Sequence, residues 1–475
     1  MGIRKYDGEP FELNVPVCVV GGGACGLTAA VSAARAGADV VVFERDATPS
    51  GSTAMTIGLI CAAGTRQQAQ LGIPDSGDDL FKDIMTATRG QTDEGLARML
   101  AMNSGPTMDW LCDEVGCDFT LETNWPGYGH GILRAHGTPN RTGEELIAML
   151  MRAAVDAGVE IITQATVTDL IVDDNQKVVG LSYTSPDGEV SVGCDAVVLA
   201  SSGFGADREM VSRFIPEMSD AVYYGCENHR GDAIKWGEAL GAEIADTGSY
   251  QGVGTHLVSY NFGIPHTVMI DGGIKVNVDG HRFENELDNI SVQAVTLTAQ
   301  PGSVGWIIYD ERGHQKALSL FEEYRRNAPL IVQKAKAEGV KDLAAITKIP
   351  EASLQTTLDE LDSLAASGLR GPFGRTFLPE ERLCPPYYAV KVTGALYHTQ
   401  GGLCIDDTAR VRRKGGGVFE NLFAGGGAAR SVSGPSDWGY LPAMGLATAV
   451  VFGRIAGHEA ALAAMSTAQK TRAAE

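Results

Sequence analysis

Blocks of apolar residues alternate with glycine-rich turns near the N-terminus. Residues 17–20 form a short apolar run that ends at three glycines, 24–36 is rich in alanine, and 40–43 is a second apolar run. Short runs of β-branched residues predict buried strands, and the alanine-rich segment followed by Gly37 predicts a helix with a glycine C-cap. Strand, glycine turn, helix and strand within about 30 residues form a βαβ unit, which is typical of an α/β protein.

The pattern changes twice along the rest of the chain. After about residue 240, short strands mix with charged helices, and from 385 the chain returns to short apolar strands and glycine turns. We therefore predict a Rossmann-like domain made of residues 1–240 and 376–475, with an α+β cap domain inserted at 241–375. The expected elements are helices at 144–157, 318–338 and 444–463, antiparallel strands at 160–173 and 177–183, and a buried strand at 195–200.

Charge and cysteine content restrict the function classes. The chain of 475 residues has a net charge of −21 at pH 7, which argues against nucleic acid or an anionic membrane as a partner but leaves an anionic substrate open. No apolar run reaches the ~18 residues of a membrane span, and the N-terminal residues do not resemble a cleaved signal sequence. The nine cysteines contain no Cys-x-x-Cys pair, which argues against a zinc site or attached haem. We expect a cytoplasmic protein without a metal site.

The first glycine turn carries a dinucleotide-binding pattern. Gly21-x-Gly23-x-x-Gly26 follows a predicted strand and opens a predicted helix. The first glycine allows the tight turn, the second lets the backbone approach a pyrophosphate, and the third lets helix and strand pack closely. Glu44 ends the next strand, 18 residues after Gly26, where a carboxylate can bond a ribose hydroxyl. This motif fits FAD and NAD equally well.

A second group of segments distinguishes the two cofactors. Residues 45–64 are rich in glycine, serine and threonine, and a loop of this kind can lie along a flavin. From this loop onward the sequence resembles the fumarate reductase and 3-ketosteroid dehydrogenase superfamily of flavoproteins. The resemblance covers nearly the whole chain and rests on DAVVLASSGFG at 195–205, Gly-Asp at 231–232, GHRFENE at 280–286, HTQGG at 398–402, and 422–426 with FGRIAG at 452–457.

The resemblance implies FAD as the cofactor. Residues 443–446 open the last helix, whose N–H groups and dipole are expected to face the flavin. Membrane-bound relatives attach FAD through a histidine in the Ser/Thr-rich loop, and 50–56 contains none, so we predict non-covalent FAD. The predicted FAD contacts are Gly21, Gly23, Ala24, Cys25, Gly26, Glu44, Arg45, Ser52, Thr53, Ile57, Gly58, Val167 on the adenine side, Ala200, Gly203, Asp232, Gly426, Ala443, Met444, Gly445 and Leu446.

The expected substrate site departs from the reductase pattern. In fumarate reductases an arginine that delivers a proton lies four residues after the Glu of the Arg-Phe-x-Asn-Glu signature, and here that position is Ile290. The family's Thr-Glu pair falls at Pro265 and His266, and a second family arginine falls at Tyr440. His398 matches a family substrate residue. Two defining cations of a fumarate site are therefore absent.

Four side chains are candidates for substrate chemistry. In ketosteroid dehydrogenases a tyrosine lies near the position of Tyr440, so this residue is expected to act as a base or as a donor to an enolate; otherwise it is a packing residue. His398 contacts substrate or caps the strand before Gly401. Arg430 either binds a carboxylate as a bidentate fork or is a solvated loop cation. His136 is either a substrate-loop histidine or a surface residue. Tyr128 and Tyr250 are weaker aromatic candidates.

Three functions remain open at this stage. The favoured one is an FAD-dependent dehydrogenase that makes a C=C bond α,β to the carbonyl of a cyclic ketone or keto acid, such as an oxocyclohexanecarboxylate or a 3-ketosteroid. The alternative is an ene reductase of the fumarate reductase type. A third is an FAD-containing assembly or carrier subunit without turnover. An external electron acceptor, oxygen or a quinone-like molecule, is expected because no second redox site is visible in the sequence.

Overall fold

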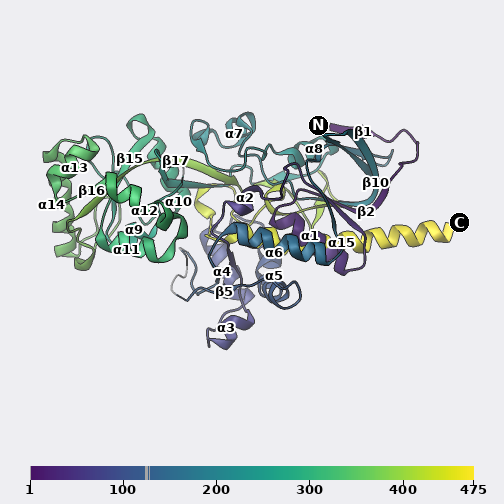
Figure 1. The fold of residues 1–475 in the computed structure, drawn as a ribbon, viewed down its shortest axis with the longest axis horizontal. Coiled ribbons are helices and arrows are strands. Elements are labelled where there is room, and N and C mark those ends of the chain that lie inside the picture. Colours follow the sequence, from purple (N-terminus) through teal and green to yellow (C-terminus); the bar gives the residue numbers. More distant parts are fainter. Residues whose placement is uncertain (1, 124–126, 128, 261, 475) are drawn as a thin grey trace. The chain divides into compact units, whose positions relative to one another are not determined.

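The computed structural model describes residues 2–123, 127, 129–260 and 262–474. The chain divides into two compact units, which are coloured along the sequence in Figure 1. The first unit consists of Met1–Phe214, Gly225–Tyr250 and His398–Glu475, and the second of Ile215–Tyr224 and Gln251–Tyr397. The first unit thus contains the predicted Rossmann-like pattern, and the fold class is α/β as expected.

The first unit is built on a nine-stranded sheet. Its strand order is β1-β8-β9-β10-β2-β3-β7, with β20 also paired to β10 and β19 paired to β20. The strands are β1 Gly2–Lys5, β2 Asn14–Val20, β3 Val40–Phe43, β7 Glu160–Ile162, β8 Thr166–Val172, β9 Val178–Ser185, β10 Gly188–Leu199, β19 Arg410–Arg412 and β20 Val418–Ala424. Strand β2 is parallel to β10 and β3, β7 is parallel to β3 at the end of the order, and β20 is parallel to β10. Strand β19 is antiparallel to β20, and β9 is antiparallel to both β8 and β10.

Shorter strands and most of the helices complete this unit. The strands are β4 Leu59–Cys61, β5 Thr120–Leu121, β6 Ala135–Gly137, β12 Ile244–Ala245 and β18 Gly402–Leu403. The helices are α1 Ala24–Arg35, α2 Gly51–Ala54, α3 Arg66–Gln70, α4 Gly77–Ala87, α5 Glu94–Asp113, α6 Gly143–Asp156, α7 Arg208–Phe214, α8 Asp232–Leu240 and α15 Met444–Ala474, with 3-10 turns at Gly426–Ala428 and Asp437–Gly439.

Helices α1 and α15 pack closely because the contact is made by small residues. A Cβ on Gly453 would lie 2.5 Å from the carbonyl oxygen of Cys25, and one on Gly457 would lie 2.0 Å from that of Ala29. Glycine at these two places therefore lets the backbones approach each other, and most of α1 is buried. The beginning of α15 is thereby positioned relative to the glycine turn that starts α1.

The second unit is a smaller α+β body. Its sheet contains β11-β17-β15-β14 in that order, with β13 and β16 also paired to β17. The strands are β11 Val222–Tyr223, β13 Tyr250–Leu257, β14 Ile274–Val276, β15 Val304–Asp310, β16 Lys336–Ala337 and β17 Tyr387–Thr399. The helices are α9 Thr267–Ile270, α10 Ile290–Thr298, α11 Glu311–Leu320, α12 Glu322–Ala335, α13 Val340–Thr347 and α14 Glu351–Ser367, with 3-10 turns at Pro216–Met218, Pro301–Ser303 and Pro379–Glu381.

The bounds of the second unit differ from the predicted 241–375. Strand β17 is the central strand of this sheet, pairing with β11, β13, β15 and β16, so the unit extends to Tyr397 rather than ending at 375. Residues Ile215–Tyr224 join it because Val222 and Tyr223 pair with β17. A pairing between segments this far apart in the chain leaves no local signal in the sequence.

The GHRFENE segment is held together inside the second unit. Arg282 lies 2.7 Å from Glu286, and Arg375 lies 3.1 Å from the same carboxylate. Burial raises the pKa of Glu286, but its two arginine partners outweigh that effect, so that its pKa is lowered overall. The signature residues therefore form a buried ion pair that ties the β14 region to the segment around Arg375.

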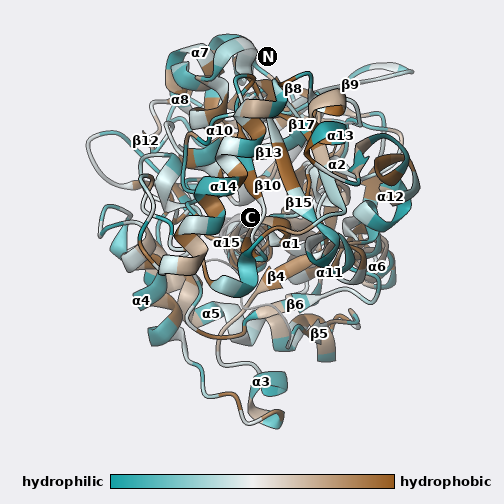
Figure 2. Ribbon diagram, turned by 90° about the vertical axis from the view of Figure 1, so that its left-hand side faces the viewer, coloured by the Kyte–Doolittle hydropathy of each residue, from teal (hydrophilic) through white to brown (hydrophobic). Residues whose placement is uncertain are grey.

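Most local predictions agree with the structure, and the differences have local causes. Strand 40–43 is confirmed, and helices 24–36 and 144–157 shift by one residue. The predicted strand 160–173 is two strands, because Gln164 adopts a positive φ of 55° between them. The predicted helix 318–338 is broken at Phe321, whose extended backbone separates α11 from α12. Figure 2 colours α1, α6, β8, α11 and α12 by the hydropathy of each residue.

Candidate active site

The glycine turn has the geometry that the motif predicts. Gly21 has a φ of 106°, and its N–H donates to the carbonyl of Phe43 at 2.9 Å. A Cβ on Gly26 would lie 1.8 Å from the carbonyl oxygen of Gly21, so only glycine allows this strand and helix to meet. A Cβ on Gly23 would meet only the hydroxyl of Thr53, at 3.5 Å. The first and third glycines are thus required by the protein itself, whereas the second is not.

Glu44, which follows β3, binds backbone N–H groups of the glycine turn. Its carboxylate accepts the N–H of Gly22 at 2.6 Å and the N–H of Asp46 at 2.9 Å. Burial raises its pKa, and the two backbone N–H groups oppose that effect. A carboxylate has about four lone-pair sites, so Glu44 can still accept a ribose hydroxyl. The residue therefore fits its predicted place at the ribose.

The start of α1 faces the loop that the sequence places along the cofactor. The hydroxyl of Thr53 accepts the N–H of Ala24 at 3.0 Å. The N–H groups of Cys25 and Gly26 lie in the first turn of the helix, where no intrahelical acceptor exists. These groups and the positive end of the helix dipole are suited to a pyrophosphate.

Arg45 and Asp232 form an ion pair beyond the strand end. A guanidinium nitrogen of Arg45 lies 2.5 Å from the carboxylate of Asp232, and another donates to the carbonyl of Asn228 at 3.1 Å. Asp232 is the first residue of α8 and is buried. Two predicted FAD residues from distant parts of the chain are thus brought together.

The other predicted cofactor residues lie on the same unit. Val167 is buried in β8, and Ala200 follows β10 beside Gly21, whose Cβ would lie 2.6 Å from the Ala200 carbonyl. The hydroxyl of Ser201 is buried, and no hydrogen-bond partner for it exists in the described part of the chain. Such a group next to the glycine turn fits a polar cofactor.

Two further predicted cofactor residues lie in turns of this unit. Ile57 is exposed, and Gly426 has a φ of 57° at the end of β20.

Two of the predicted glycines are explained by protein packing. A Cβ on Gly58 would lie 2.6 Å from the hydroxyl of Thr138 and from the carbonyl of Thr142. A Cβ on Gly203 would lie 2.0 Å from the hydroxyl of Thr399. Glycine is required at both places whether or not a cofactor is nearby.

The turn before α15 brings the predicted flavin and substrate residues together. Ala443 has a φ of 62°, which is unusual for a residue with a Cβ and marks a strained turn. The rings of His398 and Tyr440 lie edge to face with centroids 5.9 Å apart. A Cβ on Gly445 would lie 3.2 Å from the imidazole of His398. His398, Tyr440 and the predicted flavin turn Ala443–Leu446 therefore form one cluster.

Both aromatic side chains of this cluster are neutral near pH 7. Burial raises the pKa of Tyr440 well above its usual value, despite a bond from the backbone at Ala443. Burial lowers the pKa of His398 to about 4. The amide nitrogen of Gln400 lies 3.2 Å from Nδ1 of His398, and when this amide N–H donates, Nδ1 accepts and Nε2 carries the hydrogen. The cluster thus presents a phenol and an imidazole N–H, both without charge.

Cys61 and His130 contact the backbone of the turn before α15. Nε2 of His130 lies 3.0 Å from the carbonyl of Pro442, and the thiol of Cys61 lies 3.5 Å from the same oxygen. The backbone N–H of Cys61 donates to the carbonyl of Ala443 at 3.4 Å. No motif marks Cys61 or His130, and sequence reasoning missed both.

Arg430 does not offer a free guanidinium to a substrate. It lies 2.7 Å from Asp246 and 3.1 Å from Asp93. Its side chain is largely buried between these two carboxylates. The guanidinium of Arg430 is therefore already bound to Asp246 and Asp93, which compensate its charge, and it does not form the predicted fork on a substrate carboxylate.

Replacing Arg430 with Met will lower the free energy of unfolding by about 2–3 kcal/mol, because two partly buried carboxylates lose their partner. Chemical denaturation will measure the loss, and the value of kcat/KM will change less than about threefold. The control is Arg412→Met, which removes an exposed arginine. A rise in KM without loss of stability would instead assign Arg430 to the substrate.

His136 is placed in β6 rather than at the substrate site. Its Nε2 lies 3.0 Å from the hydroxyl of Thr65, and its Nδ1 lies 2.9 Å from the carbonyl of Arg134. The ring is fully buried, and burial lowers its pKa to about 4. Both ring nitrogens are satisfied by the protein, so the structure gives no support for substrate contact by His136, nor for the alternative of a surface residue.

The remaining candidates are placed as follows. Ile290 begins α10 in the second unit, and an isoleucine there cannot carry a proton. His266 is buried in the same unit, and burial lowers its pKa to about 3. Tyr250 is buried at the beginning of β13. Tyr128 lies outside the described residues.

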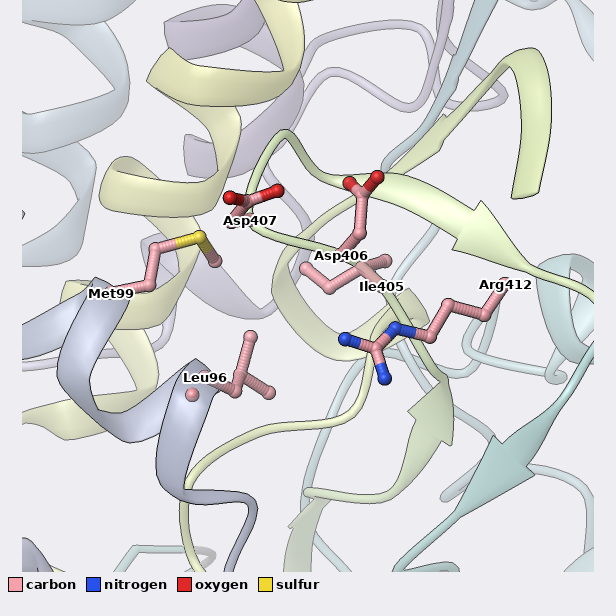
Figure 3. A pocket seen from close by; sticks show the side chains of 7 residues that line it. Leu96, Met99, Ile405, Asp406, Asp407 and Arg412 are labelled. Carbon is pink, nitrogen blue, oxygen red and sulfur yellow. The ribbon is translucent and has the colours of Figure 1, made fainter. Parts of the chain in front are cut away.

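A pocket of about 320 Å³ opens elsewhere on the first unit. Figure 3 shows Leu96 and Met99 of α5 facing Ile405 and Arg412. None of the predicted site residues lines it. Among the residues that the structure covers, no group of three or more His, Cys, Asp or Glu side chains is arranged to hold a metal ion. No helix within the described ranges has the length and apolarity needed to cross a membrane.

Comparisons with known proteins identify the group to which these features belong. The sequence matches the FAD binding domain family over residues 16–438. It is 32% identical to a probable fumarate reductase of Shewanella frigidimarina (strain NCIMB 400), over 94% of this chain and 74% of that protein. It is 25% identical to the 4-oxocyclohexanecarboxylate 2-dehydrogenase of Sinomonas cyclohexanicum, over 97% of this chain and 96% of that protein.

A solved structure resembles the whole chain. The 3-ketosteroid-Δ4-(5α)-dehydrogenase of Rhodococcus jostii RHA1, in complex with 4-androstene-3,17-dione, superposes with a TM-score of 0.77 at 25% identity. The match covers 97% of this chain and 99% of that protein. The similarity therefore includes both units, and the match to the FAD binding domain family supports the predicted cofactor.

Proposed function

The chain belongs to the FAD binding domain family that contains fumarate reductases and ketosteroid dehydrogenases, and from this membership we propose that it is a dehydrogenase making a C=C bond α,β to the carbonyl of a cyclic ketone or keto acid. FAD is its cofactor, and residues 50–56 contain no histidine for covalent attachment, so we propose that FAD is held non-covalently.

The observation that carries the proposal is the neutral pair His398 and Tyr440 beside the turn Ala443–Leu446. Clamping a dicarboxylate needs cations, but Arg430 is paired with two aspartates and position 440 holds a tyrosine. Neutral donors suit a carbonyl oxygen, which gains charge only as the enolate forms. The site therefore favours a ketone over an unsaturated dicarboxylate.

Each residue of the cluster has a definite part in this chemistry. Desaturation removes a hydride from the β carbon, which FAD would accept when bound, and a proton from the α carbon, which passes to solvent water because both residues of the cluster act as donors. Tyr440 remains protonated because its pKa is raised, so it donates its O–H to the carbonyl oxygen and stabilises the enolate. Nε2 of His398 supplies a second N–H from the adjacent ring. Of the two roles that the sequence left open for Tyr440, the geometry favours the donor over the base.

An ene reductase acting on an unsaturated carboxylate is the second candidate. It is favoured by the 32% identity to a probable fumarate reductase. We prefer the desaturase because the two cations of the reductase pattern are absent at Ile290 and Tyr440. The electrons then leave to an external acceptor, oxygen or a quinone-like molecule.

A steady-state comparison tests the proposal. The holoenzyme is assayed with 4-oxocyclohexanecarboxylate and with a 3-ketosteroid, each with an artificial dye as acceptor, and with fumarate and reduced viologen. We expect kcat/KM for at least one ketone to exceed that for fumarate by about a hundredfold, which corresponds to about 2.7 kcal/mol of transition-state stabilisation. A preference for fumarate of the same size would establish the second candidate.

The pH profile will show that His398 acts in its neutral form. Because its pKa is lowered to about 4, the ring is neutral above that pH and becomes a cation below it. Activity should therefore be constant between about pH 5.5 and 8 and fall as the pH drops through about 4. Initial rates measured after brief pH jumps will locate this fall, and His398→Gln should remove it. A fall centred near pH 6.5 would contradict the buried, neutral state of the ring.

A further inference from the structure

His229 is a buried histidine of the first unit that no motif identifies. It lies two residues before Gly231, the N-cap of α8, and its exposed fraction is 7%. Nδ1 lies 3.1 Å from the hydroxyl of Ser52, in the loop predicted to run along the cofactor. Within the described ranges, no protein group bonds Nε2 of His229. One ring nitrogen is thus engaged, whereas the other is left for a ligand.

The loop that bonds His229 lies against the start of α1. Thr53, the residue after Ser52, binds the first N–H of α1 at 3.0 Å, so the loop lies against the end of the helix that is suited to a pyrophosphate. A Cβ on Gly51 would lie 3.8 Å from Nε2 of His229. The loop therefore passes the ring at a residue that has no side chain.

We propose that His229 is an FAD-binding residue whose Nε2 forms a hydrogen bond with an oxygen of the cofactor, between the pyrophosphate and the isoalloxazine ring. The ligand class is set by the neighbours: Ser52 and Thr53 adjoin the start of α1, whereas His398 adjoins the turn Ala443–Leu446. His229 bonds Ser52 at the first of these ends and is close enough to His398 to be affected by its charge.

Electrostatics agree with this location. The pKa of His229 is lowered to about 4, mainly by burial and in smaller part by the charged forms of His398 and Arg45. The ring is therefore neutral and under the influence of groups at both ends of the site. If the hydroxyl of Ser52 donates to Nδ1, Nε2 carries the hydrogen and donates to a phosphate or carbonyl oxygen of FAD.

Two substitutions separate cofactor binding from a structural link to Ser52. An Asn side chain reaches the position of Nδ1 and keeps the bond to Ser52, whereas a Gln side chain reaches the position of Nε2. We expect His229→Gln to bind FAD within about threefold of the unchanged protein, and His229→Asn and His229→Ala to bind about tenfold more weakly. Flavin fluorescence quenching on titrating the apoprotein with FAD measures each Kd.

Thermal unfolding of the apoproteins provides the second readout. The proposal expects the Asn apoprotein to be at least as stable as the Gln apoprotein, because only the Gln variant loses the bond to Ser52, so the order of stability is opposite to the order of FAD affinity. Equal FAD affinity in all variants would overturn the proposal, as would tight binding by the Asn variant with weak binding by the Gln variant. If the Asn variant does not fold, the comparison of His229→Gln with His229→Ala decides alone, and equal FAD affinity of these two variants would overturn the proposal.

Discussion

Replacing Tyr440 with Phe will lower kcat by about 10²–10³-fold while FAD remains bound. The substitution removes one hydroxyl donor from the oxygen on which the enolate charge develops, and the loss of such a donor costs about 2.7–4 kcal/mol in the transition state. KM should change little, because the bond strengthens mainly as the charge forms. Stopped-flow reduction of the flavin by the ketone will measure the effect on the chemical step directly.

A tyrosine of the second unit is the matched control for this experiment. Tyr388 is buried, and its hydroxyl donates to Glu311 at 2.6 Å, so Tyr388→Phe also removes a bonded phenol hydroxyl. Its flavin reduction rate should stay within about twofold of the unchanged enzyme. If Tyr440→Phe retained more than half of the original kcat, the proposed role of the phenol would be wrong.

Gly26→Ala will prevent stable folding of the first unit, whereas Gly23→Ala will impair only FAD binding. The new Cβ at position 26 would lie 1.8 Å from the carbonyl oxygen of Gly21, and that backbone cannot move without separating β2 from α1. We expect a loss of about 3 kcal/mol or more, at the upper end of overpacking effects. At position 23 the backbone is extended and the new Cβ meets only ordinary contacts, so the apoprotein should keep its stability.

The two glycine variants are compared by thermal unfolding of the apoproteins and by titration with FAD. Gly23→Ala should weaken FAD binding at least about tenfold, because the second glycine is the one that lets the backbone approach a pyrophosphate. The two variants therefore distinguish a glycine that the protein fold requires, Gly26, from a glycine that cofactor binding requires, Gly23. If Gly23→Ala bound FAD normally, the pyrophosphate would not lie against this turn.

The parts of the fold that depend on local sequence were predictable. The βαβ unit from β2 to β3 follows from apolar runs and one glycine turn, and Gly21 and Gly26 have the geometry that their motif requires. The end of the second unit was not predictable, because β17 is held by strands distant from it in the chain. The break at Phe321 likewise depends on one backbone conformation inside an otherwise helical pattern.

The same distinction applies to the site. His398 and Tyr440 were predicted because each lies in a recognisable segment; the structure places their rings side by side, and their roles stay a prediction. Arg430 was misjudged as a free cation because its partners Asp93 and Asp246 lie more than 180 residues away in the chain. His136 was misjudged because Thr65, which occupies Nε2, follows a different strand. His229 was missed because only the folded chain places it beside Ser52.

The direction of the flavin reaction tests the central claim most directly. The oxidised holoenzyme is mixed anaerobically with 4-oxocyclohexanecarboxylate or a 3-ketosteroid, and the flavin absorbance is followed together with the mass of the organic product. We expect the flavin to bleach and the product to be lighter than the substrate by two hydrogens. If only dithionite bleached the flavin, and an unsaturated acid such as fumarate then restored its absorbance, the protein would be a reductase and not a desaturase.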